Sequence, residues 1–117
     1  MPLLQIQTSA LAGSASAPAG LLTRLSADVA RELGKPESYV MVSFENDAEL
    51  LFGGTAEPAC FAQLKNIGTF TPAQTEHLSA VLTKQLSAAL GVPPNRIYIE
   101  FVDAKPHLWG HDGATFA

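Results

Sequence analysis

A chain of 117 residues is long enough for one hydrophobic core, so residues 1–117 are treated as a single domain. The apolar content of 47% excludes a disordered chain, and the net charge of −4 argues against a nucleic-acid partner. Charged residues make up only 15%, against about 25% in an average domain, which indicates that other subunits cover part of the surface.

The first half of the chain is expected to form a strand, a helix and a second strand. The strands are predicted over Leu3–Thr8 and Tyr39–Glu45, where apolar and polar residues alternate. Between them, apolar residues recur at helical spacing, with Pro18 near the start and Gly34 at the end. This helical stripe consists of Leu22, Leu25, Val29 and Leu33.

The second half repeats this order. Strands are predicted over Ala59–Ile67 and Arg96–Asp103, and a helix begins at the capping box Thr71-Pro72-Ala73-Gln74. Its stripe is Leu78, Leu82, Leu86 and Leu90, and Gly91 ends it.

A weak internal duplication relates the two halves. Leu33-Gly34-Lys35-Pro36 and Leu90-Gly91-Val92-Pro93 lie 57 positions apart, and alternating apolar residues follow each of them at the same spacing. Two β-α-β units of this kind predict an α+β fold, with a four-stranded sheet and two helices on one face. Crossover connections make the two strands of each unit parallel.

The opposite face of the expected sheet is polar or adaptable but mostly uncharged. Such a face fits a sheet that meets other subunits or lines a narrow wet channel, whereas a two-layer monomer with an inert outer face is the alternative. The residues expected there are Gln5, Gln7, Met41, Ser43, Gln63 and Tyr98.

Common catalytic signatures are missing: the sequence has no phosphate loop, no Gly-x-Ser-x-Gly elbow and no paired-cysteine metal site. His107 and His111 lie four apart, but Gly110 and Gly113 would break a helix that brought them together, so no metal site is expected. Cys60 is the single cysteine, which excludes an intramolecular disulfide, and it is interpreted as a small buried hydrophobe.

No apolar run is long enough to span a membrane. No positively charged segment precedes an apolar one at the start, so a cytoplasmic location without a signal peptide is expected.

Pro2 is the remaining candidate for chemistry. If Met1 is removed, Pro2 becomes an N-terminal secondary amine, and ordinary α-amino groups titrate near ~7.7–8. Desolvation and a nearby cation both lower such a pKa toward the range of a useful base. Lys35 could supply the cation, because its counterpart in the duplication is Val92 and the turn itself does not require lysine. Alternatively, Pro2 merely begins a strand and Lys35 is a solvated surface residue.

Several short motifs along the whole chain resemble the macrophage migration inhibitory factor family of the tautomerase superfamily. They are Met1-Pro2, Gly34-Lys35-Pro36, Phe52-Gly53-Gly54, Glu57-Pro58, Ile67-Gly68, Arg96-Ile97-Tyr98-Ile99 and Ala114-Thr115-Phe116-Ala117. The resemblance implies a homotrimer with active sites at subunit boundaries. It also implies keto–enol tautomerisation, without a cofactor, of aromatic α-keto acids such as phenylpyruvate.

The same resemblance implies a role for five residues. Pro2 would be the catalytic base, and Lys35 and the backbone N–H of Ile67 would bind the carboxylate of the substrate. Tyr98, from a neighbouring subunit, and Phe116 would shape the aromatic pocket.

Three departures from the family's animal cytokines concern the pocket and the function. The Cys-x-x-Cys pair that follows Glu-Pro there is replaced by Ala59-Cys60-Phe61-Ala62, so a redox role is not expected. Glu100 stands where those proteins have Asn, and it is expected to touch the substrate and disfavour substrates with a second negative group. Trp109-Gly110 replaces Gly-Trp, which puts His111 at the Trp position. The alternative function is that of a cytokine-like ligand whose pocket serves recognition only.

Overall fold

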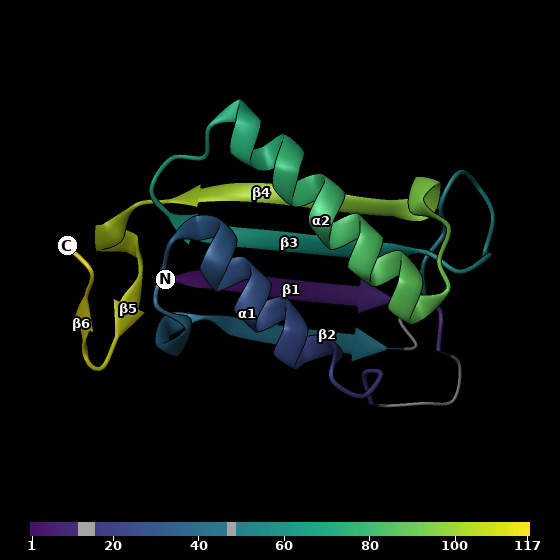
Figure 1. Ribbon diagram of the computed structural model, residues 1–117, viewed down its shortest axis with the longest axis horizontal. Helices are drawn as coiled ribbons and strands as arrows, with labels where there is room; N and C mark the ends of the chain where they lie inside the picture. Colours follow the sequence, from purple (N-terminus) through teal and green to yellow (C-terminus); the bar gives the residue numbers. More distant parts are fainter. Residues whose placement is uncertain (12–15, 47–48) are drawn as a thin grey trace.

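Two helices cover one face of a four-stranded sheet (Figure 1). This computed structural model describes residues 1–11, 16–46 and 49–117. The elements in chain order are β1 (Pro2–Thr8), α1 (Leu21–Leu33), the 3₁₀ turn η1 (Glu37–Tyr39), β2 (Met41–Asn46), β3 (Cys60–Ile67), α2 (Pro72–Leu90), η2 (Pro94–Arg96), β4 (Ile97–Ala104), η3 (Pro106–Leu108), β5 (Gly110–His111) and β6 (Ala114–Thr115). The expected α+β architecture is confirmed.

The strand order in the sheet is β2-β1-β3-β4. β1 pairs in parallel with β2 and β3 with β4, as the two β-α-β units require. The halves meet where β1 runs antiparallel to β3, with Pro2 opposite Asn66 and Thr8 opposite Cys60. The start of β1 therefore lies at the end of β3.

Both helices end as the duplication predicts. Gly34 and Gly91 adopt left-handed backbone conformations, with φ of 62° and 70°, and each donates its N–H to a carbonyl of the last helical turn. The capping box of α2 is also confirmed. The Thr71 hydroxyl accepts from the Gln74 N–H at 3.2 Å, and the Gln74 side chain accepts from the Thr71 N–H at 2.9 Å.

The core-facing stripe of α1 begins one residue earlier than expected. Leu21, at the first position of the helix, is fully buried with Leu25 and Val29, whereas Leu22 and Leu33 are only half-buried. Leu21, Leu25 and Val29 are spaced four residues apart and so share one face of the helix.

The four leucines of α2 form the upper layer of the core, against Leu4, Ile6 and Leu64 of the sheet. Leu82→Ala is expected to lower the free energy of unfolding by about 3 kcal/mol, because the side chain is fully buried and its loss leaves a cavity. Urea denaturation measures this change. Lys84→Ala on the exposed side of α2 is the control, and an equally small change in both variants would contradict the expectation.

Three strands begin later than predicted: β3 starts at Cys60 instead of Ala59, and a 3₁₀ turn that follows a proline delays the start of β2 and of β4. Tyr39 belongs to η1, where its N–H donates to the Pro36 carbonyl at 3.1 Å. Arg96 likewise ends η2, with its N–H donating to the Pro93 carbonyl at 2.9 Å. Proline fixes φ near the value that these tight turns need.

The open face of the sheet is more charged than expected. The predicted polar residues do lie on it, but so do Glu45, Lys65 and Glu100, which alternate with the less exposed, helix-facing residues of their strands. The Gln7 amide donates to Glu45 at 3.1 Å, and the Gln63 amide donates to Glu100 at 2.5 Å. Each of these two carboxylates therefore accepts a hydrogen bond from a glutamine on the neighbouring strand.

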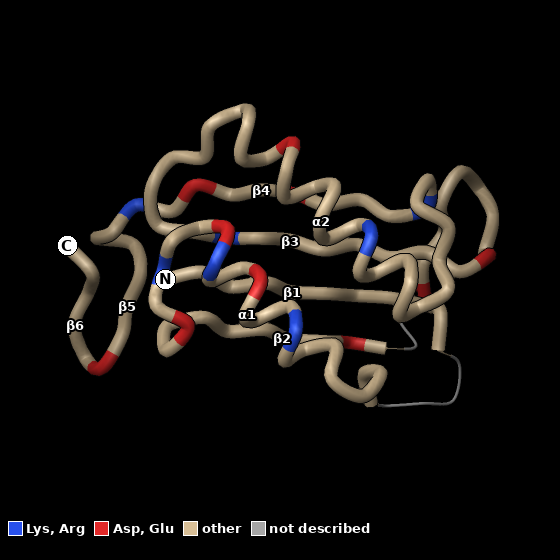
Figure 2. The backbone as a smooth tube through the Cα atoms, viewed as in Figure 1, with Lys and Arg blue, Asp and Glu red and all other residues tan. Residues whose placement is uncertain are grey.

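Charged residues are otherwise spread over helices, strands and loops (Figure 2). Within the described ranges, no helix is both long and apolar enough to cross a membrane.

Candidate functional site

The chain begins in a partly buried position at the start of β1. Burial lowers the pKa of the Met1 α-amino group, and the positive charge of Lys35 lowers it further. The Pro2 side chain is fully buried, and the nitrogen of Pro2 lies one residue beyond this amino group. The beginning of β1 is thus an environment that favours an uncharged amine.

Lys35 reaches this position from the turn after α1. The left-handed Gly34 redirects the chain, and the Lys35 N–H donates to the Ala30 carbonyl at 3.0 Å. The ammonium of Lys35 donates to the Ile67 carbonyl at 3.4 Å. Its counterpart Val92 is 1% exposed and packs in the core, so this location in the duplicated unit does not by itself require a cation.

Pro2, Lys35 and Ile67 are therefore brought together from β1, the α1–η1 turn and the end of β3. An amine with a lowered pKa beside a lysine can remove a proton from carbon and hold an anionic substrate. Pro2 and Lys35 were candidates from the sequence itself, and Ile67 was implied by the family resemblance; in the structure, Lys35 contacts the carbonyl of Ile67.

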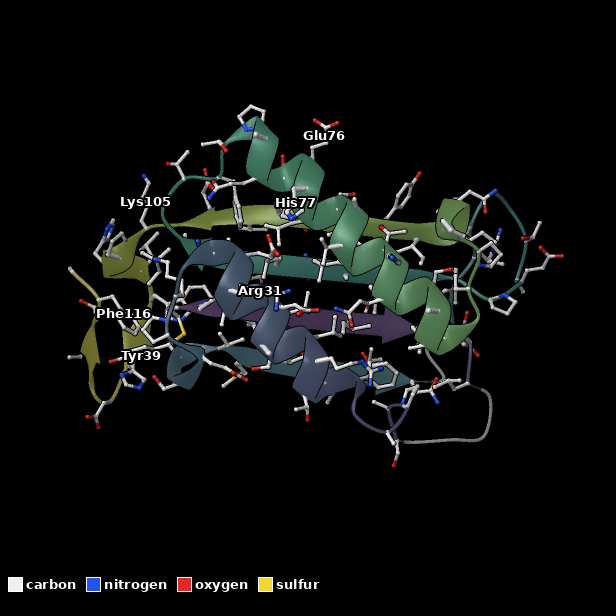
Figure 3. All side chains as sticks on the ribbon, in the orientation of Figure 1. Arg31, Tyr39, Glu76, His77, Lys105 and Phe116 are labelled. Atoms are coloured by element: carbon white, nitrogen blue, oxygen red, sulfur yellow. The ribbon has the colours of Figure 1, made fainter. Side chains whose placement is uncertain are left out.

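Aromatic rings form a second cluster, in which Phe116 lies beside Tyr39 (Figure 3). The Tyr39 ring contacts the Phe116 ring at 6.1 Å and the His111 ring at 5.8 Å between centroids. His111 stacks on Phe116 at 5.5 Å. Because Tyr39 follows Lys35 by four residues, this cluster adjoins the Lys35 turn.

Tyr39 was missed as a site residue because it was assigned to a strand. Its spacing from the Lys35 turn could not reveal that β5 and β6 would bring Phe116 to it. His107 belongs to η3 and takes no part in the cluster, and the described residues contain no group of three potential metal ligands.

Tyr98 and Glu100 lie away from Pro2 within one chain. Tyr98 is level with Gln7, five residues along β1 from Pro2, which corresponds to about 17 Å. Glu100 is level with Gln5, about 10 Å along the strand, and faces the open side of the sheet. The structure of a single chain thus separates these two predicted site residues from the other four.

The end of the sheet that carries Tyr98 has its own features. A cavity of about 220 Å³ is lined there by apolar residues that include Phe52, Cys60 and Tyr98. The centroids of the Phe52 and Tyr98 rings are 4.8 Å apart. Cys60 is buried as expected, and burial raises the pKa of its thiol to about 12, which keeps it protonated and unreactive.

Arg96 holds the loop before β3 in place. Its guanidinium donates to the carbonyls of Phe52, Thr55, Glu57 and Pro58 at 2.9–3.3 Å, and it lies 5.2 Å from the centre of the Phe52 ring. One side chain thereby fixes the backbone of residues 52–58 to the start of β4.

Comparison with known proteins identifies the family. The family model described as macrophage migration inhibitory factor (MIF) matches residues 1–117. The chain belongs to the MIF family. A MIF homologue of Trichinella spiralis is 39% identical over 116 residues, which cover 99% of this chain and 100% of the relative. The MIF of Rattus norvegicus is 34% identical over the full length of both chains.

Solved MIF structures share the fold. The MIF homologue from Prochlorococcus marinus matches with a TM-score of 0.90 and 38% identity, covering 98% of this chain and 99% of its own. The MIF from Trichinella spiralis matches with a TM-score of 0.89 and 38% identity, over 97% and 99% of the two chains. Membership in the MIF family supports tautomerase-type isomerase chemistry in general terms.

Proposed function

We propose that the protein is a cofactor-independent keto–enol tautomerase of aromatic α-keto acids such as phenylpyruvate, with Pro2 as the general base after removal of Met1. The observation that carries the proposal is the environment at the start of β1, where burial and Lys35 lower the pKa of an α-amino group. A base near neutral pKa suits abstraction of a proton from carbon next to a carbonyl.

In the proposed reaction, the Pro2 nitrogen takes a proton from the carbon adjacent to the substrate's keto group. The electrons of that C–H bond form a carbon–carbon double bond, and the carbonyl oxygen becomes a hydroxyl by accepting a proton from water. Protonated Pro2 then releases its proton to solvent, which regenerates the base. The reverse sequence converts enol to keto acid. Because a proton lost from one atom is gained by another, no oxidant or reductant is needed.

Lys35 is proposed to bind the substrate carboxylate, together with the backbone N–H of Ile67. Its ammonium donates to the Ile67 carbonyl at the end of β3, and from there it would attract an anionic substrate toward Pro2. Phe116 and Tyr39 would provide an aromatic wall on the side of the η1 turn.

The proposal includes a homotrimer whose sites lie between subunits. Tyr98 is about 17 Å from Pro2 along its own sheet, so it can contribute to a site at Pro2 only from another copy. It is 65% exposed in the single chain, which leaves it free to make such a contact. Glu100, two residues further along β4, would approach the same boundary and add its negative charge.

Lys35→Ala is expected to raise KM for phenylpyruvate about tenfold, with a smaller decrease in kcat, because carboxylate binding is lost in both ground and transition states. Removal of the cation also raises the pKa of Pro2, so the acidic limb of kcat/KM moves to higher pH. Steady-state kinetics across pH measure both effects.

Lys84→Ala, a lysine removed from the exposed side of α2, is the matched control for this experiment. If Lys35→Ala and the control give the same KM and the same pH profile, Lys35 is a solvated surface residue. An inactive but folded protein that begins at Pro2 would instead favour the alternative function, a binding ligand with an unused pocket.

A further inference from the structure

A buried polar atom without a partner lies beside the start of β1. Asn66 is only 7% exposed, and its side-chain oxygen Oδ1 is buried with no hydrogen-bond donor among the described residues. An unsatisfied buried carbonyl is costly, and such groups are rare in folded proteins. This position therefore requires a physical explanation.

The register of the sheet places Asn66 directly opposite Pro2. Opposed residues in antiparallel strands point to the same face and hold their Cβ atoms about 5 Å apart, a span that an asparagine side chain can bridge. Both residues are buried under the helices. While Met1 is attached, however, the Pro2 nitrogen is an amide without a hydrogen and has nothing to donate.

We propose that Asn66 is a positioning residue for the Pro2 base. Once Met1 is removed, its Oδ1 accepts a hydrogen bond from an N–H of Pro2, in both the neutral and the protonated state of that amine. This inference rests on the proposed function, in which Pro2 is an N-terminal amine that gains and loses a proton in each turnover.

The bond has a defined chemical consequence. A neutral secondary amine offers one N–H and the protonated form offers two, so an acceptor favours the form that has just received a proton from the substrate. Asn66 therefore opposes the effects of burial and Lys35, and it orients the lone pair of the free amine. The tautomerase would then retain enough basicity to abstract a proton from carbon.

Other charged groups near this point come from several elements. Lys35 lies on the turn after α1, and Asp103 is opposite Asn66 on β4, where its carboxylate accepts from the Phe70 N–H at 3.1 Å. Further ionisable groups on the elements at this end of the fold include Glu32 near the end of α1, Glu37 and Tyr39 on η1, Lys65 on β3, His77 on α2, Lys105 and His107 after β4, His111 on β5 and Asp112 after it. None of them supplies a hydrogen-bond donor to Asn66 Oδ1 in the part of the chain that is described.

The direct test is an NMR titration of protein that begins at Pro2, labelled with ¹⁵N-proline and ¹³C-asparagine. The Pro2 amine nitrogen is distinct from the other seven proline nitrogens, because those are all amides. The side-chain carbonyl carbon of Asn66 is expected to titrate with the same midpoint as the Pro2 nitrogen. In protein that retains Met1, that carbon should show no such transition.

Substitutions provide the second arm of the test. Asn66→Leu, similar in size but without the acceptor, is expected to lower the pKa of Pro2 by about one unit, and Asn66→Asp to raise it by at least as much. Asn95→Leu, in η2 at the far end of the sheet, is the control and should leave that pKa unchanged.

The inference is overturned if the Asn66 carbon does not follow the Pro2 titration, or if Asn66→Leu leaves the Pro2 pKa unchanged. In that case Oδ1 binds water instead. The wild-type titration gives an answer even if a variant does not fold. It also needs no turnover, so failure of the tautomerase proposal would be seen separately, as an inactive protein whose Pro2 and Asn66 still titrate together.

Discussion

Protein that retains Met1 is expected to show at least about a hundredfold lower tautomerase activity toward phenylpyruvate than protein that begins at Pro2. With Met1 attached, the lone pair of the Pro2 nitrogen is delocalised into a peptide bond and cannot accept a proton near neutral pH. The extra residue also occupies space beside Lys35 that the substrate would need. Mass spectrometry identifies the form present in each preparation, and the two preparations are then assayed.

The pH profile of the processed form adds a second criterion. Burial and Lys35 lower the pKa of the amine at this end of β1, so kcat/KM should fall on the acidic side with a midpoint below that of an ordinary α-amino group. Pro2→Gly in processed protein keeps an amine but loses the rigid ring, and it should retain a small part of the activity. Equal activity with and without Met1 would mean that Pro2 is not the base.

Mixed assemblies of two impaired variants are expected to recover activity. Pro2→Gly and Tyr98→Ala should each be strongly impaired alone, because each lacks one component of every site. In a random mixture of the two chains, about a quarter of the sites in a trimer would combine an intact Pro2 with an intact Tyr98 from the neighbour. Activity should therefore rise well above the mean of the two parents after co-refolding.

The experiment also tests the assembly itself. Sedimentation of the wild type at micromolar concentration should give the mass of a trimer, and a monomer would remove the basis for shared sites. A trimer whose mixtures show only the mean activity of the parents would place Tyr98 outside the site. Phe101→Tyr mixed with Pro2→Gly serves as the control pair, since Phe101 lies on the helix-covered face of β4.

Local patterns in the sequence were sufficient to predict the helices and the parallel strand pairs. The capping box of α2 and the two left-handed glycines depend on neighbouring residues, so their geometry follows from short segments. The start of α1 was less certain from sequence, because both Leu21 and Leu22 can continue a helical stripe. Only packing against the sheet buries Leu21 fully.

Longer-range relationships could not be predicted from the residues in the same way. The antiparallel pairing of β1 with β3 joins the two halves, and the duplication specifies only pairing within each half. Asn66 therefore gave no signal in the sequence, although it lies opposite Pro2. The contact of Tyr39 with Phe116 likewise depends on the fold of the C-terminal hairpin.

The hydrogen bonds of Arg96 bear on the proposed association between subunits. A surface loop that is disordered before binding loses conformational entropy when a partner orders it, and this loss weakens the complex. Residues 52–58 are already held through four of their carbonyls, and the Phe52 ring is packed on Tyr98. The conformational entropy of residues 52–58 is therefore lost when the chain folds. Binding of a partner at this edge would not have to order the loop again.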